Sequence, residues 1–386
     1  MQVVQATFAV YHQFELAHQM LNRGHLRRIY STWPWARVKR EGIPREYVDT
    51  FPLVNTADYL LNRTRYYPRS VSIRMNRWNA LSFDAYTRRS LPQCDAFIAI
   101  SGAGLDTGKL AQSRGAKFIC DRGSTHQRFQ EEVVRGEYKR WNVPLELDAP
   151  HIVVREEQIY DAADAITVPS SAVRRSFLQM GMPQDKIHVI PYGVRLDRFI
   201  KDGDAPKDSF EVLFAGQVGL RKGVPYLLEA FARLRHPKKH LTLAGSIAEH
   251  IRPLLATLPT ENVTFLGAIP QTELISRMSR SHVMVLPSIE EGLALVQAQA
   301  LACQLPVIAT EATGAEDLFS DQVEGFIVKD RDVDALSERI QRLADEPHLR
   351  QQMSAAALRR VKSFGGWDTY GDRWERLLLE LTSRDG

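Results

Sequence analysis

Two series of short apolar, β-rich runs alternate with amphipathic segments along the chain, and this pattern limits the possible folds more than any other feature. Each run has four to eight residues, which is typical of buried strands in parallel sheets built from strand–helix units. The first series comprises residues 3–8, 96–100, 116–120, 165–168 and 187–190, and the second 210–215, 240–244, 263–266, 283–286 and 306–309. We therefore expect two doubly wound α/β domains.

A polar stretch rich in turn-forming residues, 201–208, separates the two series and marks a linker. The length of 386 residues suits two cores of comparable size. We expect a first domain over 1–195, a linker over 196–208, and a second domain over 209–365. Apolar positions recur at helical spacing from Trp367 to Leu381, so we predict that 366–386 forms a helix that packs back on the first domain.

Composition favours a soluble, cytoplasmic protein. Apolar residues make up 44% and charged residues 25% of the chain, and no run approaches the roughly 20 apolar residues of a membrane span. The first residues lack the basic and small-residue features of a secretion signal. Cys94, Cys120 and Cys303 are scattered, which indicates buried thiols and neither a disulfide framework nor a closed zinc site.

The net charge of +4 is unevenly distributed, because residues 1–100 hold fourteen Arg or Lys against seven Asp or Glu. Much of this excess lies between Arg63 and Arg89, where arginines alternate with aromatic residues such as Tyr66 and Trp78. Such a segment suits peripheral contact with anionic lipid headgroups or with an anionic acceptor. The alternative is a solvated helix face whose aromatic side chains turn inward. No nucleic acid partner is expected.

A strand, a glycine-punctuated loop and a helix starting near Val224 follow one another over 214–225. Gly216 and Gly219 allow the backbone to approach a ligand, and a helix N-terminus favours phosphate. Arg221 and Lys222 add positive charge there, which would stabilise a departing diphosphate. A surface loop with two solvated bases is the alternative.

The stretch 286–303 predicts a strand end followed by a helix, with Glu291 just before the helix. If the span were fully helical, Glu291 and Gln299 would lie about 12 Å apart along its axis, close to the sugar-to-ribose reach of a nucleotide sugar. Glu291 would then accept hydrogen bonds from sugar hydroxyls and Gln299 would bond the ribose. Helix capping by Glu291 and a solvated Gln299 are the alternative.

Taken in order, these motifs resemble glycosyltransferase family 4, retaining enzymes of the GT-B fold, and the similarity covers nearly the whole chain. It rests on Val168-Pro169-Ser170, on 186–194, on Arg221-Lys222-Gly223 with 226–231, on Pro287-Ser288 through Glu291-Gly292, on 306–310 with Gly314, and on Glu324-Gly325-Phe326. The resemblance implies two Rossmann-like domains facing a cleft. It also implies that a hexose-type sugar moves from a nucleoside-diphosphate sugar to the hydroxyl of a glycan, lipid-linked or small-molecule acceptor. No metal or other cofactor is expected.

By the same resemblance, the second domain holds the donor. The diphosphate would lie at Arg221 and Lys222 and the sugar at Glu291. The other donor-binding candidates are Gly216, Gln217, Gly219, Gly267, Ile269, Gly292, Leu293 and Gln299. Three positions depart from the family pattern: Gln299 replaces a glutamate that binds ribose, Gln217 stands near the position of a basic residue, and Ala294 replaces a glycine.

The first domain supplies the remaining candidates. His126 follows a strand and opens a helix, and the resemblance implies contact with the transferred sugar, although a helix-start histidine is often structural. Asp121, Arg122 and His12 are acceptor-side candidates, with packing as the alternative for His12. Bulky residues replace the glycines that the family usually carries in its first turn, which suggests that they shape an acceptor pocket.

The acidic pairs Asp202/Asp204 and Asp330/Asp332 suggest solvated turns more than metal ligands. Two rival functions stay open: a catalytically degenerate sugar-binding or scaffold relative, and a sugar-nucleotide epimerase. A dinucleotide-dependent oxidoreductase is set aside because neither first turn carries a G-x-G-x-x-G fingerprint.

Overall fold

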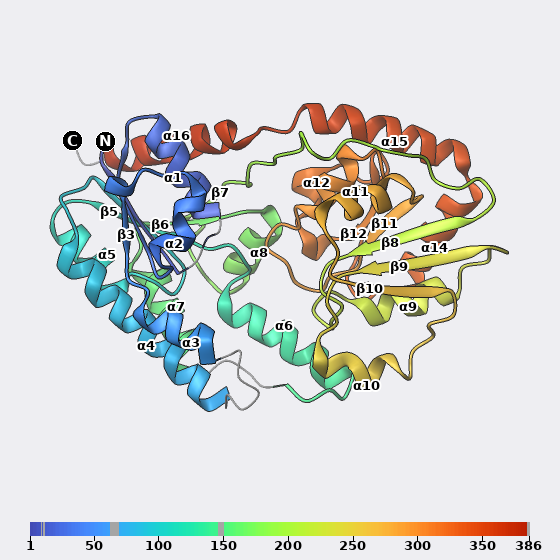
Figure 1. The fold of residues 1–386 in the computed structure, drawn as a ribbon, viewed down its shortest axis with the longest axis horizontal. Helices are drawn as coiled ribbons and strands as arrows, with labels where there is room; N and C mark the ends of the chain where they lie inside the picture. Colours follow the sequence, from blue (N-terminus) through green and yellow to red (C-terminus); the bar gives the residue numbers. More distant parts are fainter. Residues whose placement is uncertain (9, 11, 62–68, 146–149, 384–386) are drawn as a thin grey trace.

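The computed structural model describes residues 1–386 except 9, 11, 62–68, 146–149 and 384–386. It contains two parallel sheets, each flanked by helices, one in each half of the molecule (Figure 1). The expected α/β class with two doubly wound domains is therefore confirmed.

The first sheet has seven strands in the order β3-β2-β1-β4-β5-β6-β7. Their bounds are Val48–Thr50, Leu26–Ser31, Val3–Thr7, Ala96–Ile100, Lys117–Asp121, Ala165–Val168 and Ile187–Val189. The order reverses between β1 and β4, so the loops that follow these two strands diverge at one edge and leave a crevice, which is the usual place for a ligand in such sheets.

The second sheet has six strands in the order β10-β9-β8-β11-β12-β13. Their bounds are Val263–Gly267, Lys239–Ala244, Phe210–Ala215, Val283–Leu286, Val307–Thr310 and Gly325–Val328. Here the reversal falls between β8 and β11. The loops that carry Arg221 and Glu291 follow these two strands and therefore meet at the second crevice.

Helices connect the strands within each sheet, and within the described residues three further helices follow the last strand of the second sheet. The first half holds α1 (His12–Asn22), α2 (Trp35–Val38), α3 (Leu53–Leu61), α4 (Arg69–Ser90), α5 (Leu105–Ser113), α6 (Gln127–Arg140), α7 (Pro150–Ala162) and α8 (Ser171–Gln179). The second half holds α9 (Val224–Ala232), α10 (Arg252–Leu255), α11 (Gln271–Ser279), α12 (Val296–Ala302), α13 (Ala315–Leu318), α14 (Val333–Asp345), α15 (Pro347–Lys362) and α16 (Trp367–Ser383).

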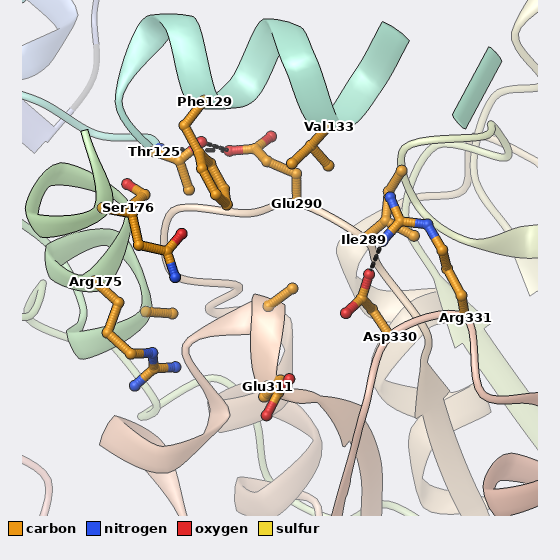
Figure 2. Close-up of a pocket in the computed structure, with 13 residues that line it drawn as sticks. Thr125, Phe129, Val133, Arg175, Ser176, Ile289, Glu290, Glu311, Asp330 and Arg331 are labelled. Atoms are coloured by element: carbon orange, nitrogen blue, oxygen red, sulfur yellow. Dashed lines mark hydrogen bonds and ion pairs between the residues drawn. The ribbon is translucent and has the colours of Figure 1, made fainter. Parts of the chain in front are cut away.

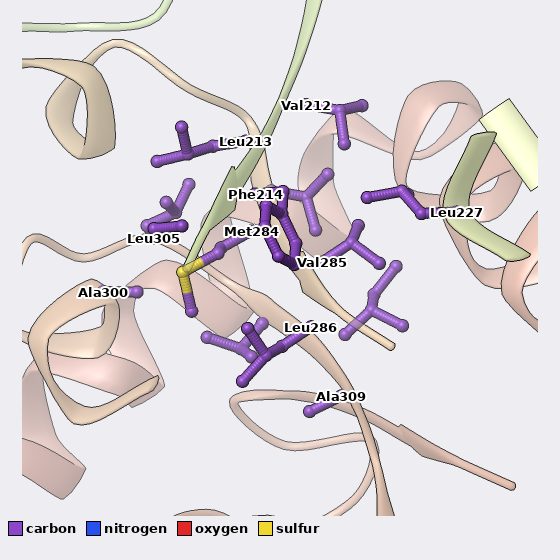
Figure 3. Close-up of a cluster of buried hydrophobic side chains, with 14 of the residues drawn as sticks. Val212, Leu213, Phe214, Leu227, Met284, Val285, Leu286, Ala300, Leu305 and Ala309 are labelled. Atoms are coloured by element: carbon purple, nitrogen blue, oxygen red, sulfur yellow. The ribbon is translucent and has the colours of Figure 1, made fainter. Parts of the chain in front are cut away.

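Buried apolar side chains fill the space between each sheet and its helices. In the second half, strand residues such as Phe214 and Met284 pack against Leu227 of α9 and Ala300 of α12 (Figure 3). In the first half, α16 contributes Trp374, which is fully buried in one cluster with Phe14 of α1. Truncating a buried tryptophan costs about 3–5 kcal/mol, so α16 is an integral part of this core.

Helix α6 connects the two halves. It follows β5 and so begins at the carboxyl edge of the first sheet. Its later part packs on the second core through Val133 and the adjacent Trp141. Glu137 of α6 is fully buried and accepts hydrogen bonds from Tyr226 of α9 (2.6 Å) and from Arg331 after β13 (2.7 Å). Removing one partner of such a buried ion pair costs about 3–5 kcal/mol, so this contact holds α6 firmly on the second half.

The structure differs from the sequence pattern at several elements. Strands β2, β3 and β13 were not predicted, because β2 mixes arginines with apolar residues, β3 has a single apolar residue in Val-Asp-Thr, and β13 begins with glycine. Helix α12 begins at Val296, so the span from Glu291 to Gln299 is not fully helical and the distance derived from a continuous helix does not apply. Helix α9 begins at Val224, as expected.

Candidate active site

The predicted cations and the predicted carboxylate lie together at the crevice of the second sheet. Lys222 donates a hydrogen bond to Glu291, and Arg221 lies 3.6 Å from the same carboxylate. The two loops are also tied through their backbones, because the amide of Ile289 donates to the carbonyl of Arg221 at 2.9 Å. The alternative of two solvated surface bases therefore does not hold for this pair.

A cavity of about 240 Å³ lies at this point and is lined by Gly216, Lys222, Glu291 and Ala294, together with Ala215, Leu286, Leu295 and Val296. It is smaller than the roughly 300–1,000 Å³ of typical small-molecule sites. Ala294, which stands where the family pattern has glycine, is one of the residues that line this small cavity. In this conformation the cavity has room for part of a nucleotide sugar only.

Glycine is required where the loop after β8 meets the loop after β11. Gly223 has φ +66°, and a Cβ there would lie 1.9 Å from the carbonyl oxygen of Pro287. A side chain at this position would push the two loops apart and separate Lys222 from Glu291. Gly219 is buried in the same loop, whereas Gln217 is exposed.

Glu290, which the sequence did not single out, is the most connected carboxylate of the site. Its side chain is fully buried, lies 3.2 Å from Arg221, and accepts hydrogen bonds from Ser124 (2.8 Å), Thr125 (2.7 Å) and Gln130 (2.9 Å) across the domain boundary. Burial opposes its charge, but the attraction of Arg221 and these hydrogen bonds outweigh burial and lower its pKa. Glu290 therefore holds the first half of the chain against the loop that carries Arg221.

The adjacent residues Glu290 and Glu291 line different cavities. Glu291 lines the small cavity beside Lys222, whereas Glu290 lines a second cavity of about 460 Å³ between the two halves (Figure 2). Thr125 and Phe129 lie on one side of this second cavity, and Glu311 on the other.

The two halves make close contact at Gly292. A Cβ on this residue would lie 1.9 Å from the carbonyl oxygen of Gly123, and the hydroxyl of Ser170 donates to the carbonyl of Gly292 at 2.6 Å. Only glycine allows the loops after β5 and β11 to approach this closely. The conformation is thus one in which the two crevices face each other at short range.

The remaining donor-binding candidates lie outside this cluster. Gln299 is partly exposed on α12, and no hydrogen bond of its side chain is found among the described residues. Gly267 ends β10 and its carbonyl accepts from Gly245, while Ile269 packs partly against the second core. Leu293 is 8% exposed and joins that core. Their roles toward a nucleotide remain predictions.

On the first half, His12 and Asp121 form a pair. His12 Nε2 lies 2.7 Å from Asp121 Oδ2, and the imidazole packs on Tyr192 with ring centroids 4.3 Å apart. Thr167 donates to the other carboxylate oxygen at 3.0 Å. A Cβ on Gly123 would lie 3.6 Å from His12, which places the pair beside the interdomain contact.

His126 lies apart from the charged cluster. It is 3% exposed, packs between Tyr160 and Phe177, and caps α6 by accepting a hydrogen bond from the amide of Arg128 at 3.3 Å. Burial lowers its pKa to about 4, so the ring is neutral near pH 7. These are the contacts of a structural helix-start histidine, the alternative that the sequence left open.

Arg122 is buried, and its side chain bonds residues of the turn between β5 and α6. Its guanidinium donates to the carbonyl of Thr125 at 3.0 Å and to Gln127 at 2.9 Å, and it lies 3.4 Å from Glu156 of α7. Its hydrogen bond to the carbonyl of Thr125 positions that residue, whose hydroxyl in turn donates to Glu290.

Other sequence candidates have the following outcomes. The three cysteines are buried and free, as expected. Asp332 caps α14 by accepting from the amide of Ala335, and no group of three or more potential metal ligands occurs among the described residues. Of the segment from Arg63 to Arg89, residues 63–68 lie outside the described part. Within the rest, Tyr86 turns inward and bonds Asp49, whereas Trp78 is 67% exposed. No helix of the described residues is long and apolar enough to cross a bilayer.

The chain is similar to known glycosyltransferases. The family "Glycosyl transferases group 1" matches residues 197–360, and "Glycosyltransferase Family 4" matches residues 123–198. A D-inositol 3-phosphate glycosyltransferase of Xylanimonas cellulosilytica is 29% identical over 56% of this chain and 57% of its own length. A GDP-mannose-dependent alpha-(1-6)-phosphatidylinositol monomannoside mannosyltransferase of Mycolicibacterium smegmatis is 28% identical over 70% of this chain and 72% of its own.

Solved structures resemble the whole chain. Sucrose-phosphate synthase from Thermosynechococcus elongatus has a TM-score of 0.71 at 20% identity, with both chains fully covered. The HepE protein of Anabaena in complex with UDP and glucose has a TM-score of 0.68 at 16% identity, covering 98% of this chain and all of its own.

The fold is thus GT-B: two Rossmann-like halves whose strand ends face each other. The chain belongs to the group 1 glycosyltransferases of the family 4 kind. The chain spans a little over half the length of the D-inositol 3-phosphate glycosyltransferase of Xylanimonas cellulosilytica and of two further relatives with that description from Streptomyces avermitilis and Streptomyces scabiei.

Proposed function

We propose that the chain transfers a hexose-type sugar from a nucleoside-diphosphate sugar to an acceptor hydroxyl, with retention of the anomeric configuration. The observation that carries the proposal is the pairing of Arg221 and Lys222 with Glu291 at the crevice between β8 and β11. Ligands of doubly wound sheets bind at this point. Its cations suit a diphosphate, and its carboxylate suits the hydroxyls of a sugar.

In this proposal, the bond between the anomeric carbon and the diphosphate oxygen breaks while the acceptor oxygen bonds to the same carbon. Negative charge grows on the diphosphate, and Arg221 and Lys222 stabilise it there. The departing phosphate oxygen receives the acceptor proton. Because the two side chains supply the positive charge, no metal ion is required. Glu291, released from Lys222 when phosphate arrives, accepts hydrogen bonds from the donor sugar.

His12 and Asp121 supply the acceptor side. The carboxylate, also bonded by Thr167, fixes the orientation of the imidazole beside Gly123, where the acceptor hydroxyl would lie close to the donor sugar. We assign His126 to the support of α6 and not to contact with the reacting atoms.

Two relatives suggest which donors to test: one is described as GDP-mannose-dependent, and one solved relative binds UDP and glucose. Purified protein is incubated with UDP-, GDP- and ADP-sugars, and both thermal stabilisation and release of the nucleoside diphosphate are measured. We expect one donor to give both signals. Lys222→Ala is expected to lose both, whereas Lys238→Ala, which removes an exposed lysine paired with Asp208, retains them.

The rival functions give different results in the same experiment. Stabilisation by a donor without release of diphosphate, even with acceptors present, would support the degenerate sugar-binding relative and contradict the proposal. Release of an epimerised sugar would support the epimerase. Retention itself is tested by the anomeric proton of the product in NMR, and an inverted product would assign His12 and Asp121 as general base and its orienting carboxylate.

A further inference from the structure

Among the described residues, the guanidinium of Arg221 is anchored through a single nitrogen atom. Nη1 lies 3.2 Å from a carboxylate oxygen of Glu290, donates to the backbone carbonyl of the same residue at 3.1 Å, and lies 3.6 Å from Glu291. The side chain is 38% exposed. A guanidinium is planar and holds its N–H donors in a fixed fork, so anchoring at Nη1 sets the direction of the donors on Nε and Nη2. Such a fork suits the oxygens of a phosphate group.

The carboxylate that anchors Arg221 is itself held by the first half of the chain. One oxygen of Glu290, Oε1, accepts hydrogen bonds from the hydroxyls of Ser124 and Thr125 (Figure 2). The other, Oε2, accepts from the side-chain amide of Gln130 and contacts Arg221. The three first-half partners lie in the turn after β5 and the first turn of α6. Because both oxygens of a fully buried carboxylate are engaged, the direction of Arg221 depends on residues 124–130.

Lys222, the second cation of the crevice, is held in a different way. It donates to Glu291, which also accepts from the hydroxyl of Ser288 at 3.2 Å. All three residues belong to the second half, so these contacts do not involve the first. An ammonium group is also a compact charge with rotatable donors, for which direction matters less than for a planar fork. The two adjacent cations therefore differ in that only the contacts of Arg221 lead, through Glu290, to the other half.

We propose that Glu290 is a positioning residue of the transfer reaction, which directs the fork of Arg221 at the departing diphosphate and is itself fixed by Ser124 and Thr125. The inference rests on the proposed function, because it assigns a role within that reaction. Charge grows on the diphosphate as its bond to the sugar breaks, and a donor that already points there stabilises the charge without reorganising. Glu290 acts through Arg221 and contacts neither the sugar nor the diphosphate.

Steady-state kinetics of Glu290→Gln, with the donor that the wild type accepts, tests this role. An amide has one acceptor oxygen and no charge, so it cannot serve both the turn after β5 and Arg221. Removing a transition-state donor outright costs about 10²–10³ in kcat, and misdirecting it should cost at least about tenfold. The KM for the donor should change by less than about threefold, because Lys222 and Glu291 keep their contacts.

Two further comparisons separate positioning from a contribution to the domain contact alone. In an Arg221→Lys background there is no fork to direct, so Glu290→Gln should lower kcat by less than about twofold further. Glu316→Gln is the matched control, because Glu316 also pairs across the two halves, with Arg175, and should keep kcat within about twofold. Thr125→Val removes one hydrogen bond to Glu290 and should lower kcat by about threefold, again only when Arg221 is present.

An equal loss of kcat in both backgrounds would overturn the proposal, and a gain of activity in Glu290→Gln would show that the carboxylate withholds Arg221 from the diphosphate. The Tm of each variant without donor shows whether it folds, and Thr125→Val carries the comparison if Glu290→Gln does not. A wild type that turns over no donor contradicts the proposed function and this role with it. Donor turnover by the wild type, with Glu290→Gln as active as Glu316→Gln, contradicts only the role of Glu290.

Discussion

Replacing His126 by asparagine is expected to reduce the decrease in the free energy of unfolding that the protein undergoes in acid. The imidazole is 3% exposed between two aromatic rings, and burial lowers its pKa from 6.5 to about 4. Between these two pH values the unfolded chain binds a proton that the folded chain does not, so stability falls as pH falls from 6.5 toward 4. The shift of about 2.5 pKa units corresponds to roughly 3 kcal/mol.

Urea unfolding of the wild type and of His126→Asn, at a series of pH values from 7.5 to 4, measures this contribution. Asparagine retains a side-chain oxygen that can cap α6 but does not titrate in this range. The variant loses some packing energy at every pH. The further decrease of its free energy of unfolding between pH 7.5 and 4 should be about 3 kcal/mol smaller than that of the wild type. Part of the slope remains because desolvation lowers the pKa of the half-buried His282 to about 4 as well. Identical pH slopes in the two proteins would refute the reasoning, and abolished turnover in a stable variant would restore His126 to the reaction.

Three further predictions concern the domain contact and the donor site. Glu137→Ala should lower the free energy of unfolding by about 3–5 kcal/mol in urea titrations, because Arg331 and Tyr226 lose a fully buried partner, and Glu137→Gln should cost less since it can still accept from Tyr226. Gly292→Ala should reduce kcat by at least about tenfold, because its Cβ would lie 1.9 Å from the carbonyl oxygen of Gly123 and keep the two halves from the approach seen in this structure. The Tm of the variant serves as the check that it folds, and an unchanged kcat would show that this approach is not needed for transfer. Under the proposed function, turnover should be the same in EDTA as in added magnesium, because Arg221 and Lys222 would supply the positive charge at the diphosphate, and a requirement for magnesium would contradict that proposal.

The architecture could be predicted from the sequence because parallel strands are buried on both faces and appear as continuous apolar runs. Runs such as 210–215 and 283–286 correspond to β8 and β11 in full. Strand β2 was missed because Arg27 and Arg28 interrupt its apolar pattern, and Arg28 is only 3.6 Å from Asp49 of β3. That contact compensates a charge on the strand but leaves no signal in the local sequence.

The candidate site was predictable where chemistry is concentrated in one loop. Arg221, Lys222 and Gly223 are adjacent, and their place after a strand indicated an anion site. His126 is different: a histidine at a helix start looks the same in sequence whether it faces a cleft or an aromatic pocket. Tyr160 and Phe177, which enclose it, come from α7 and α8, and only the fold brings them there.

Glu290 shows why the domain contact could not be predicted from the sequence. It differs from Glu291 by one position in an irregular loop, where no helical or strand period assigns a direction to a side chain. Its partners Ser124, Thr125 and Gln130 lie more than 150 positions earlier and reach it only because α6 leaves the first half and packs on the second. Glu137 fixes the C-terminal end of α6 to the second half through Tyr226 and Arg331. If α6 moved away with the first half, the carboxylate of Glu137 would lose these partners, at a cost of several kcal/mol. Opening is therefore expected to break the contacts of Gly292 with Gly123 and Ser170, while Glu137 and its partners stay together.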